Sequence, residues 1–284
     1  MNISIKEIDA GKPFDWGRTS EDYAKYRDIY PPVFYRRIIE RNLCVSGQRV
    51  LDIGTGTGVI PRNLYPCGAD CTGADISAEQ IAQAKRLSEQ SRQHISWITS
   101  AAEDLEFPDQ TFDVITACQC FWYFDYEKLS PLLHRILKKN GTLLLLYMSW
   151  LPFEDEIAGA SEQLVLKYSP GWSGAGETVH PIQADPGLLD WFLPVRHEEY
   201  RVEIPFTRET WNGRMKACRG VGASLTPEEI RQWEAEHLRL LAETAPEQFT
   251  VAHYIASAEF TPRHEVFATM SSDEFNKSQN QRAT

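Results

Sequence analysis

The sequence has no surplus of positive charge, because 29 lysines and arginines stand against 40 aspartates and glutamates, a formal net charge of −11. A nucleic-acid partner is normally met by an excess of basic residues, so this balance disfavours a nucleic-acid substrate. The longest apolar run, LLLLYM at 143–148, is too short to cross a bilayer, and the N-terminus has no apolar core of signal-peptide length. We therefore expect a cytoplasmic protein with no nucleic-acid and no membrane partner.

Cysteine is present, but not in the spacing of a metal site. The chain has six cysteines; Cys67 and Cys71 lie four positions apart, and Cys118 and Cys120 lie two apart. Neither pair forms the CxxC knuckle of zinc proteins, so free, reduced thiols are the preferred interpretation. No metal is predicted.

What the sequence does contain is an alternation of short apolar runs with helical patterns between residues 36 and 150. Such alternation is typical of a parallel sheet covered by helices. The runs that predict strands are RVLDI at 49–53, DCTGAD at 70–75, ISWITS at 95–100, FDVITAC at 112–118 and TLLLLYM at 142–148. After the second run, Ser77 can cap a helix and Gln80 stands at the capping-box position, which completes a βαβ unit.

The second half of the chain departs from this rhythm. Residues 151–190 are rich in Gly, Pro and Trp, which indicates an insertion rather than another βα unit. The last two strands are predicted at 199–207 and 249–260. Between them, Thr226 can cap a helix with Pro227 in its first turn and Glu229 at the box position, so a helical cap is expected at about 208–246.

A glycine-rich loop, VLDIGTGTG at 50–58, follows the first predicted strand. Its glycines let a ligand lie against bare backbone where a Cβ would collide. Dinucleotide enzymes use the related pattern GxGxxG, but here the third glycine comes one residue early and Val59 takes the last place. By itself the loop predicts a nucleoside-type ligand. The residues expected to bind it are Asp52, Gly54, Thr55, Gly56 and Gly58.

An acidic residue ends the second predicted strand. Asp75 stands where a carboxylate can accept hydrogen bonds from both hydroxyls of an adenosine ribose. Ile76 and Gln80 follow it and are expected at the same ligand. More than one ligand class uses an acid at this position, so Asp75 alone does not choose among them.

The next two segments carry a family resemblance. SAAEDLEFPDQTFDVI at 100–115 and CQCFWYFDYEKL at 118–129 resemble the adenine-side motif and the post-strand segment of class I S-adenosylmethionine-dependent methyltransferases. Within that class the similarity is to the small-molecule group of methyltransferase type 11 and ubiquinone-pathway enzymes. The resemblance implies an α/β fold with a Rossmann-like, seven-stranded, mostly parallel sheet, helices on both faces and a helical cap from insertions. It implies S-adenosylmethionine as cofactor and S-adenosylhomocysteine as product.

The same resemblance assigns residues to the cofactor and the acceptor. The positions that match those beside the adenine or beneath the transferred methyl are Ala102, Glu103, Asp104, Cys118, Gln119 and Cys120. Trp122 and Tyr123 stand where the acceptor enters, at the carboxyl end of a central strand. The segment lacks the Asn/Asp-Pro-Pro-Tyr sequence of many amino-methylating nucleic-acid enzymes, which again favours a small-molecule acceptor.

Upstream, SEDYAKYRDIYPP at 20–32 resembles the N-terminal helix that closes over the cofactor in small-molecule members. Tyr23, Tyr26, Arg27 and Tyr30 fall on one face of such a helix. In this interpretation the rings cover a sulfonium, Arg27 meets the methionine carboxylate and Tyr30 contributes to the acceptor site. The alternative is an amphipathic helix that only packs.

A general base is needed only if the acceptor must lose a proton. The candidates are His180 in the insertion, His253 in the seventh predicted strand and Tyr123. For each histidine the alternative is a surface residue or a hydrogen-bonded structural one.

Three cations stand close together in the cap of an otherwise acidic chain: Arg214, Lys216 and Arg219. They could steer an anionic small molecule, such as a carboxylate, into the site, with Arg214 and Arg219 binding it. Alternatively they form surface salt bridges with neighbouring glutamates. The tryptophans that could add apolar walls to the site are Trp150, Trp172 and Trp211.

The predicted organisation comprises a cofactor-covering helix at 1–35, a cofactor-binding core at 36–150, an insertion over the active site at 151–198, the last strands with the cap at 199–261 and a flexible tail at 262–284. The predicted function is methyl transfer from S-adenosylmethionine to a small-molecule acceptor by in-line displacement. The alternatives are an NAD(P)-dependent Rossmann oxidoreductase, a macromolecule-directed methyltransferase and a cofactor-binding protein that has lost catalysis.

Overall fold

The computed structural model describes residues 3–264, and a seven-stranded sheet lies at its centre with the strand order β3-β2-β1-β4-β5-β7-β6. The strands are β1 Arg49–Ile53, β2 Asp70–Asp75, β3 Ser96–Thr99, β4 Phe112–Cys118, β5 Leu137–Trp150, β6 Phe192–Thr207 and β7 Gln248–Pro262. The first five pair in parallel, whereas β7 runs antiparallel to both β5 and β6. The predicted mostly parallel α/β sheet is confirmed. The predicted tail at 262–284 falls largely on residues outside the described range.

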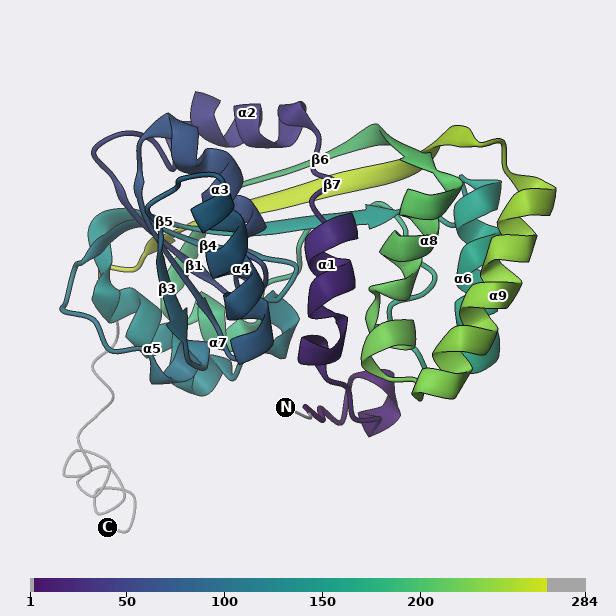
Figure 1. Ribbon diagram of the computed structural model, residues 1–284. Coiled ribbons are helices and arrows are strands. Elements are labelled where there is room, and N and C mark those ends of the chain that lie inside the picture. The colour runs from purple at the N-terminus through teal and green to yellow at the C-terminus, as the bar shows by residue number, and fades with distance from the viewer. Residues whose placement is uncertain (1–2, 265–284) are drawn as a thin grey trace, which may run out of the picture.

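Helices cover both faces of this sheet (Figure 1). They are α2 Pro32–Glu40, α3 Val59–Leu64, α4 Ala78–Gln90, α5 Tyr126–Ile136 and α7 Pro186–Leu189. Successive strand residues point to opposite faces, so Val50 of β1 packs in the cluster that holds Ile60 of α3, and Leu51 packs in the cluster that holds Leu133 of α5. The two clusters bury the two faces of the sheet.

The strands differ from the sequence prediction mainly in length. The bounds predicted for β1, β2 and β4 match the structure, whereas β5 begins at Leu137 instead of 142 and β6 begins at Phe192 instead of 199. The added part of β6, FLPVRHE at 192–198, pairs with the end of β7. Its residues are largely exposed and do not alternate between apolar and polar, which is the pattern that marks a strand. Pairing, rather than local propensity, extends β6.

Three helices form a cap at one end of the sheet, where β5, β6 and β7 extend beyond the other strands (Figure 1). They are α6 Glu156–Tyr168, α8 Arg208–Lys216 and α9 Pro227–Thr244. The capping box at the N-terminus of α9 is as predicted. The Thr226 side chain accepts a hydrogen bond from the Glu229 N–H, and the Glu229 carboxylate accepts one from the Thr226 N–H. Helix α6 lies in the segment predicted to be an insertion, for which no helix was specified.

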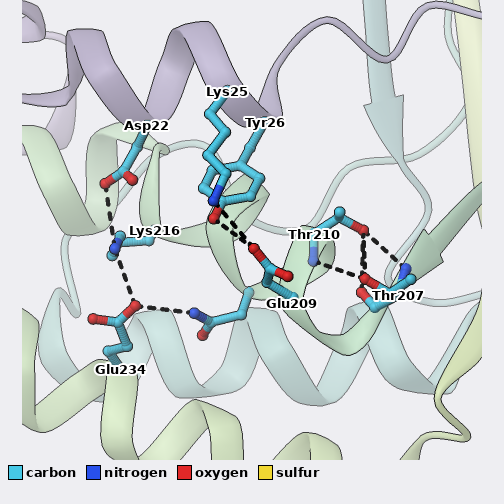
Figure 2. Close-up of polar contacts among 9 residues, drawn as sticks. Asp22, Lys25, Tyr26, Thr207, Glu209, Thr210, Lys216 and Glu234 are labelled. Atoms are coloured by element: carbon cyan, nitrogen blue, oxygen red, sulfur yellow. Dashed lines mark hydrogen bonds and ion pairs between the residues drawn. The ribbon is translucent and has the colours of Figure 1, made fainter.

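Helix α1, Ser20–Tyr26, lies between the cap and the helices beside the sheet (Figure 1). Figure 2 shows how it is held: Lys25 and Tyr26 both reach Glu209, at 3.1 and 3.2 Å. The prediction of one helix over 20–32 is wrong, because α1 ends at Tyr26 and Pro31 keeps Tyr30 out of the helical region. None of the helices within residues 3–264 has the length and apolar composition that a membrane span requires.

Candidate functional site

A cavity of about 360 Å³ opens at the carboxyl ends of β1, β2, β4 and β5, beneath the cap. In an open α/β sheet this edge is where ligands bind. Its wall joins the glycine-rich loop, the segments after β2 and β4, helix α1 and the cap. Of the residues predicted for a cofactor, those that line the cavity are Tyr23, Arg27, Gly54, Gly56, Asp75, Ile76, Gln80, Ala102, Glu103, Cys118, Gln119 and Cys120.

The glycines of the loop serve different purposes. Gly54 and Gly56 line the cavity. A Cβ on Gly56 would make an ordinary contact with the Tyr23 ring at 3.6 Å, whereas a Cβ on Gly54 would lie 2.7 Å from the Cys120 side chain. Gly58 does not line the cavity; it caps α3 at φ +74°, and a Cβ there would lie 2.2 Å from the Trp97 ring. Packing and backbone conformation, not a ligand, require the third glycine.

Asp75 presents its carboxylate to the cavity from the end of β2. Its two oxygens accept the N–H groups of Gly56 and Ser77 at 2.8 and 2.9 Å. Burial raises the pKa of this carboxyl despite those bonds. Each oxygen keeps a further lone pair, so Asp75 can still accept hydrogen bonds from ligand hydroxyls.

Gln80 lines the cavity, as predicted, but its side chain does not close the predicted capping box. Ser77 caps α4 by accepting the Gln80 N–H, as expected, but the Gln80 side chain does not return to Ser77. It donates instead to the Trp16 carbonyl at 3.0 Å. Gln80 thereby ties the N-terminal segment to the cavity wall, and Trp16 lines the cavity beside it.

Asp52 lies beneath the loop rather than at the cavity, and only 1% of it is exposed. Thr55 and Thr116 each donate a hydroxyl to its carboxylate at 2.5 Å. Burial raises the pKa of Asp52 to about 7, because two hydroxyl donors compensate the charge only in part. The structure places Asp52 and Thr55 as supports of the loop.

Asp52 gives the free energy of unfolding a defined pH dependence. Its pKa is raised on folding from the ordinary 3.8, so the folded state binds a proton more tightly and this contribution falls as pH rises from about 4 to about 7. The slope approaches about 1.4 kcal/mol per pH unit within that window. We expect Asp52→Asn to remove it, measured as the difference between wild-type and variant urea unfolding from pH 4 to 8. Parallel curves would contradict this assignment.

Only part of the adenine-side motif lies in the cavity wall. Ala102 and Glu103 line the cavity, whereas Asp104 does not. Glu103 also accepts the Asp125 N–H at 2.9 Å, which anchors the start of α5. Ser100 and Ala101 line the same wall and were not predicted as contacts.

Tyr30 and Tyr26 lie outside the cavity wall, in contrast to their predicted roles. The Gln119 side-chain amide donates to the Tyr30 hydroxyl and to the Met148 carbonyl, both at 2.9 Å. Tyr30 therefore supports the post-β4 segment from behind. Tyr26 packs over Gly213, where a Cβ would lie 2.3 Å from its ring, and bonds Glu209.

The cap end of the cavity carries uncompensated positive charge. Arg27 lies over the Tyr23 ring at 4.5 Å, and Arg214 lies over the Trp150 ring at 4.9 Å. Among residues 3–264 neither has a carboxylate partner, and Nε and Nη1 of the 3% exposed Arg214 have no hydrogen-bond partner. Burial, followed by the charge of Arg27, lowers the pKa of Arg214 to about 9.

The other two cap cations are paired, although the partner of Arg219 is a buried aspartate rather than a neighbouring surface glutamate as the alternative supposed. Arg219 lines the cavity but bonds Asp9 through two nitrogens, at 2.6 and 3.0 Å, and donates to the Tyr123 hydroxyl at 2.5 Å. Lys216 lies off the cavity between Asp22 and Glu234, at 3.4 and 3.0 Å (Figure 2). Arg214 is thus the cap cation left for a ligand.

Neither predicted histidine lines the cavity. His253 is fully buried on β7, its Nδ1 lies 2.9 Å from the Val251 carbonyl, and burial lowers its pKa to about 3. His180 is partly exposed and bonds Glu177 at 2.8 Å. Trp122, Tyr123, Trp150 and Trp172 do line the cavity, whereas Trp211 is a core residue.

Several side chains that line the cavity were not predicted from the sequence. They include Ile3, Trp16, Phe124, Tyr147, Ser149 and Cys218. Trp16 precedes the recognised motifs, and Tyr147 stands in the apolar run LLLLYM, whose leucines are core residues. Only its position at the carboxyl end of a strand could have marked Tyr147.

Comparison with known proteins gives consistent matches. Residues 51–145 match a family described as a methyltransferase domain. A ubiquinone biosynthesis O-methyltransferase of Bradyrhizobium sp. (strain ORS 278) is 30% identical over 62% of this chain and 71% of its own length. A demethylmenaquinone methyltransferase of Thermus thermophilus is 35% identical over 39% of this chain and 52% of its own.

A solved structure, assigned provisionally as a type II methyltransferase of Anaeromyxobacter dehalogenans, shares the fold. It superposes with a TM-score of 0.55 at 18% identity, covering 81% of this chain and 96% of that one. At this identity the likeness concerns the arrangement of helices and strands.

Proposed function

Because the chain belongs to the class I S-adenosylmethionine-dependent methyltransferases, we propose that it methylates a small-molecule acceptor carrying an anionic group, such as a carboxylate. The observation that carries this proposal is Arg214, a buried guanidinium that lines the cavity without a carboxylate partner in residues 3–264. Because the chain belongs to this family, the alternative of an NAD(P)-dependent oxidoreductase is rejected.

The cavity residues fit S-adenosylmethionine. Gly54 and Gly56 offer bare backbone, Asp75 keeps lone pairs for ribose hydroxyls, and Arg27 is available for the methionine carboxylate. When bound, the cofactor supplies a methyl group on an electrophilic sulfonium. The protein's part is to align the acceptor with that methyl group and to keep water out.

The balance of charges at the cap end of the cavity supports an anionic group on the acceptor. Arg27 and Arg214 are close enough for one to lower the pKa of the other, so the cap end holds two uncompensated cations. S-adenosylmethionine brings one carboxylate but also an ammonium and the sulfonium, a net positive charge. Buried charge without a counter-charge is costly. An anionic acceptor supplies the counter-charge that the cofactor does not.

The walls around Arg214 suit a compact acceptor with an apolar body. Trp122, Tyr123, Trp150 and Trp172 line the cavity, and Trp16 lines it from the N-terminal segment. Aromatic side chains bury large apolar areas, and Arg214 stacks on one of them. The acidic charge of the chain also favours a small molecule over a nucleic acid as the acceptor.

The test is methyl transfer from S-adenosylmethionine labelled in the methyl group. Small carboxylates with apolar bodies are compared with the corresponding amides, and with total RNA and denatured protein. We expect label in the carboxylates and little in the amides. Label in RNA or protein alone would overturn the small-molecule proposal, and equal label in the amides would overturn the anionic acceptor. Cofactor binding with no transfer to any of them would indicate a protein without catalysis.

A narrower prediction concerns Asp75. Asp75→Ala should weaken S-adenosylhomocysteine binding by about 1–3 kcal/mol, roughly five- to 150-fold in Kd, because hydrogen bonds to a charged acceptor are lost. Isothermal titration calorimetry measures this. The matched control is Asp104→Ala, since Asp104 does not line the cavity and should leave Kd within about twofold. Equal effects of the two variants would remove Asp75 from the ribose site.

A further inference from the structure

Glu177, in the segment between α6 and α7, gathers three hydrogen-bond donors behind the cavity wall. Its Oε2 accepts the Tyr147 hydroxyl at 2.5 Å. Its Oε1 accepts the Tyr254 hydroxyl at 2.9 Å and faces His180 Nε2 at 2.8 Å. The carboxylate is thus oriented with one oxygen given to Tyr147 alone.

Tyr147 connects this carboxylate to the cavity. It lines the cavity from the last part of β5, as does Ser149. The Trp122 ring, on the acceptor side, lies 5.5 Å from the Tyr147 ring. Arg214 lies over the ring of Trp150, which follows Tyr147 by three residues on β5 and also lines the cavity.

The other titratable side chains discussed for the cavity wall make different contacts from Tyr147. No histidine is among the lining residues of 3–264, and Asp75 and Glu103 lie at the cofactor end. The hydroxyls of Tyr23 and Tyr123 accept from guanidiniums, at 3.4 and 2.5 Å, so neither has a base to receive its proton. The Tyr147 hydroxyl donates to a carboxylate.

We propose that Tyr147 and Glu177 form the proton-accepting pair of the site, and that the acceptor is a hydroxy acid methylated on its hydroxyl oxygen. This inference rests on the proposed function: Arg214 holds the carboxylate of the acceptor, and Tyr147 faces its hydroxyl. Tyr147 is the catalytic residue, because it lines the cavity. Glu177 acts through it.

The step balances without any further reactant. The acceptor oxygen forms a bond to the methyl carbon as the carbon–sulfur bond breaks, and sulfur keeps that electron pair. The acceptor hydroxyl proton passes to Tyr147 Oη, while the proton of Tyr147 passes to Glu177 Oε2. The Glu177 side chain is 16% exposed, so the carboxylic acid can return its proton to solvent.

The surroundings of Tyr147 suit a relay rather than a stored phenolate. Burial, followed by the neighbouring Glu177 carboxylate, raises the pKa of Tyr147 well above its ordinary value. The phenol therefore stays neutral, and the proton that it gives to Glu177 is replaced by the proton of the acceptor hydroxyl. General-base assistance of this kind contributes about 10²–10⁴-fold to a rate.

Tyr254 provides a matched control, because a purely structural role would treat it like Tyr147. Both tyrosines donate one hydroxyl to Glu177, and both changes to Phe remove one hydrogen bond from the same carboxylate. Tyr254 does not line the cavity. If the network only fixes the segment around Glu177, the two variants should have equal effects.

The experiment measures kcat and KM for the protein with S-adenosylmethionine and a panel of hydroxybenzoates and short aliphatic hydroxy acids, each compared with its deoxy acid. Tyr147→Phe and Glu177→Gln should lower kcat about 100-fold, with KM and S-adenosylhomocysteine affinity within about twofold. Tyr254→Phe should lose less than about threefold. Thermal melting checks that all variants fold.

Several results would overturn the inference, and they differ from failure of the proposed function. Equal losses in Tyr147→Phe and Tyr254→Phe would reduce the pair to a structural network. Methylation of the deoxy acids at the same rate would show that the hydroxyl is not the acceptor atom. A wild-type protein that binds S-adenosylhomocysteine but methylates no acid would overturn the proposed function, and the proton-accepting pair with it.

Discussion

Arg214→Met is expected to raise the acceptor KM by about 30-fold or more while making the acceptor-free protein more stable. The guanidinium is 3% exposed and has no carboxylate partner in residues 3–264, so in the empty protein it is an uncompensated buried charge. Losing a buried partner of a charged ligand costs about 2–5 kcal/mol. Replacing buried charge by an apolar side chain is neutral or stabilising by about 1–4 kcal/mol. A more stable protein that binds the acceptor more weakly would identify Arg214 as a ligand-binding cation.

The control for this prediction is Arg219→Met, because Arg219 lines the same cavity but is paired with Asp9. Removing it leaves the buried Asp9 carboxylate without its partner, which should destabilise the protein by about 3–5 kcal/mol. Urea unfolding and acceptor kinetics measure both variants, and S-adenosylhomocysteine affinity should stay unchanged in Arg214→Met. A destabilised Arg214→Met protein with unchanged KM would show that Arg214 is a structural residue.

Gly58→Ala is expected to lower the free energy of unfolding by about 2–5 kcal/mol. The residue has φ +74°, and its added Cβ would lie 2.2 Å from the rigid Trp97 ring. Left-handed backbone costs a non-glycine residue roughly 1–2 kcal/mol. Overpacking of a core adds about 1–3 kcal/mol. The change acts on the loop through Trp97, without touching the cavity.

Gly47→Ala separates these two contributions. Gly47 has φ +86°, but nothing lies within 4 Å of an added Cβ, so only the backbone cost of about 1–2 kcal/mol should appear. In addition, Trp97→Leu should relieve part of the Gly58→Ala loss in a double-mutant cycle. If Gly58→Ala loses no more than Gly47→Ala, the contact with Trp97 does not constrain this position.

The cofactor half of the site follows from the sequence because its residues are local. Gly54, Gly56, Asp75 and Cys118 stand at the ends of β1, β2 and β4, and the parallel sheet brings these ends together. Strand periodicity locates the ends, and the spacing of the glycines narrows the ligand class. No contact between distant segments has to be known in advance.

The acceptor half depends on contacts that sequence spacing does not contain. Arg214, Lys216 and Arg219 look alike along the chain, yet Asp9 is 210 residues from Arg219 and Asp22 comes from α1. Only the fold shows that two of these cations are neutralised. Tyr147 and Glu177 are likewise joined across 30 residues, so their hydrogen bond is not visible in the sequence. The sequence pattern indicated His180 and His253 as base candidates instead.

The most direct test of the account is isothermal titration calorimetry of the full chain with S-adenosylhomocysteine and, separately, with NAD. The cavity should give saturable one-site binding of S-adenosylhomocysteine that Asp75→Ala weakens and Arg214→Met leaves unchanged, and no heat with NAD. Saturable NAD binding without S-adenosylhomocysteine binding would contradict the assignment of the cavity to S-adenosylmethionine.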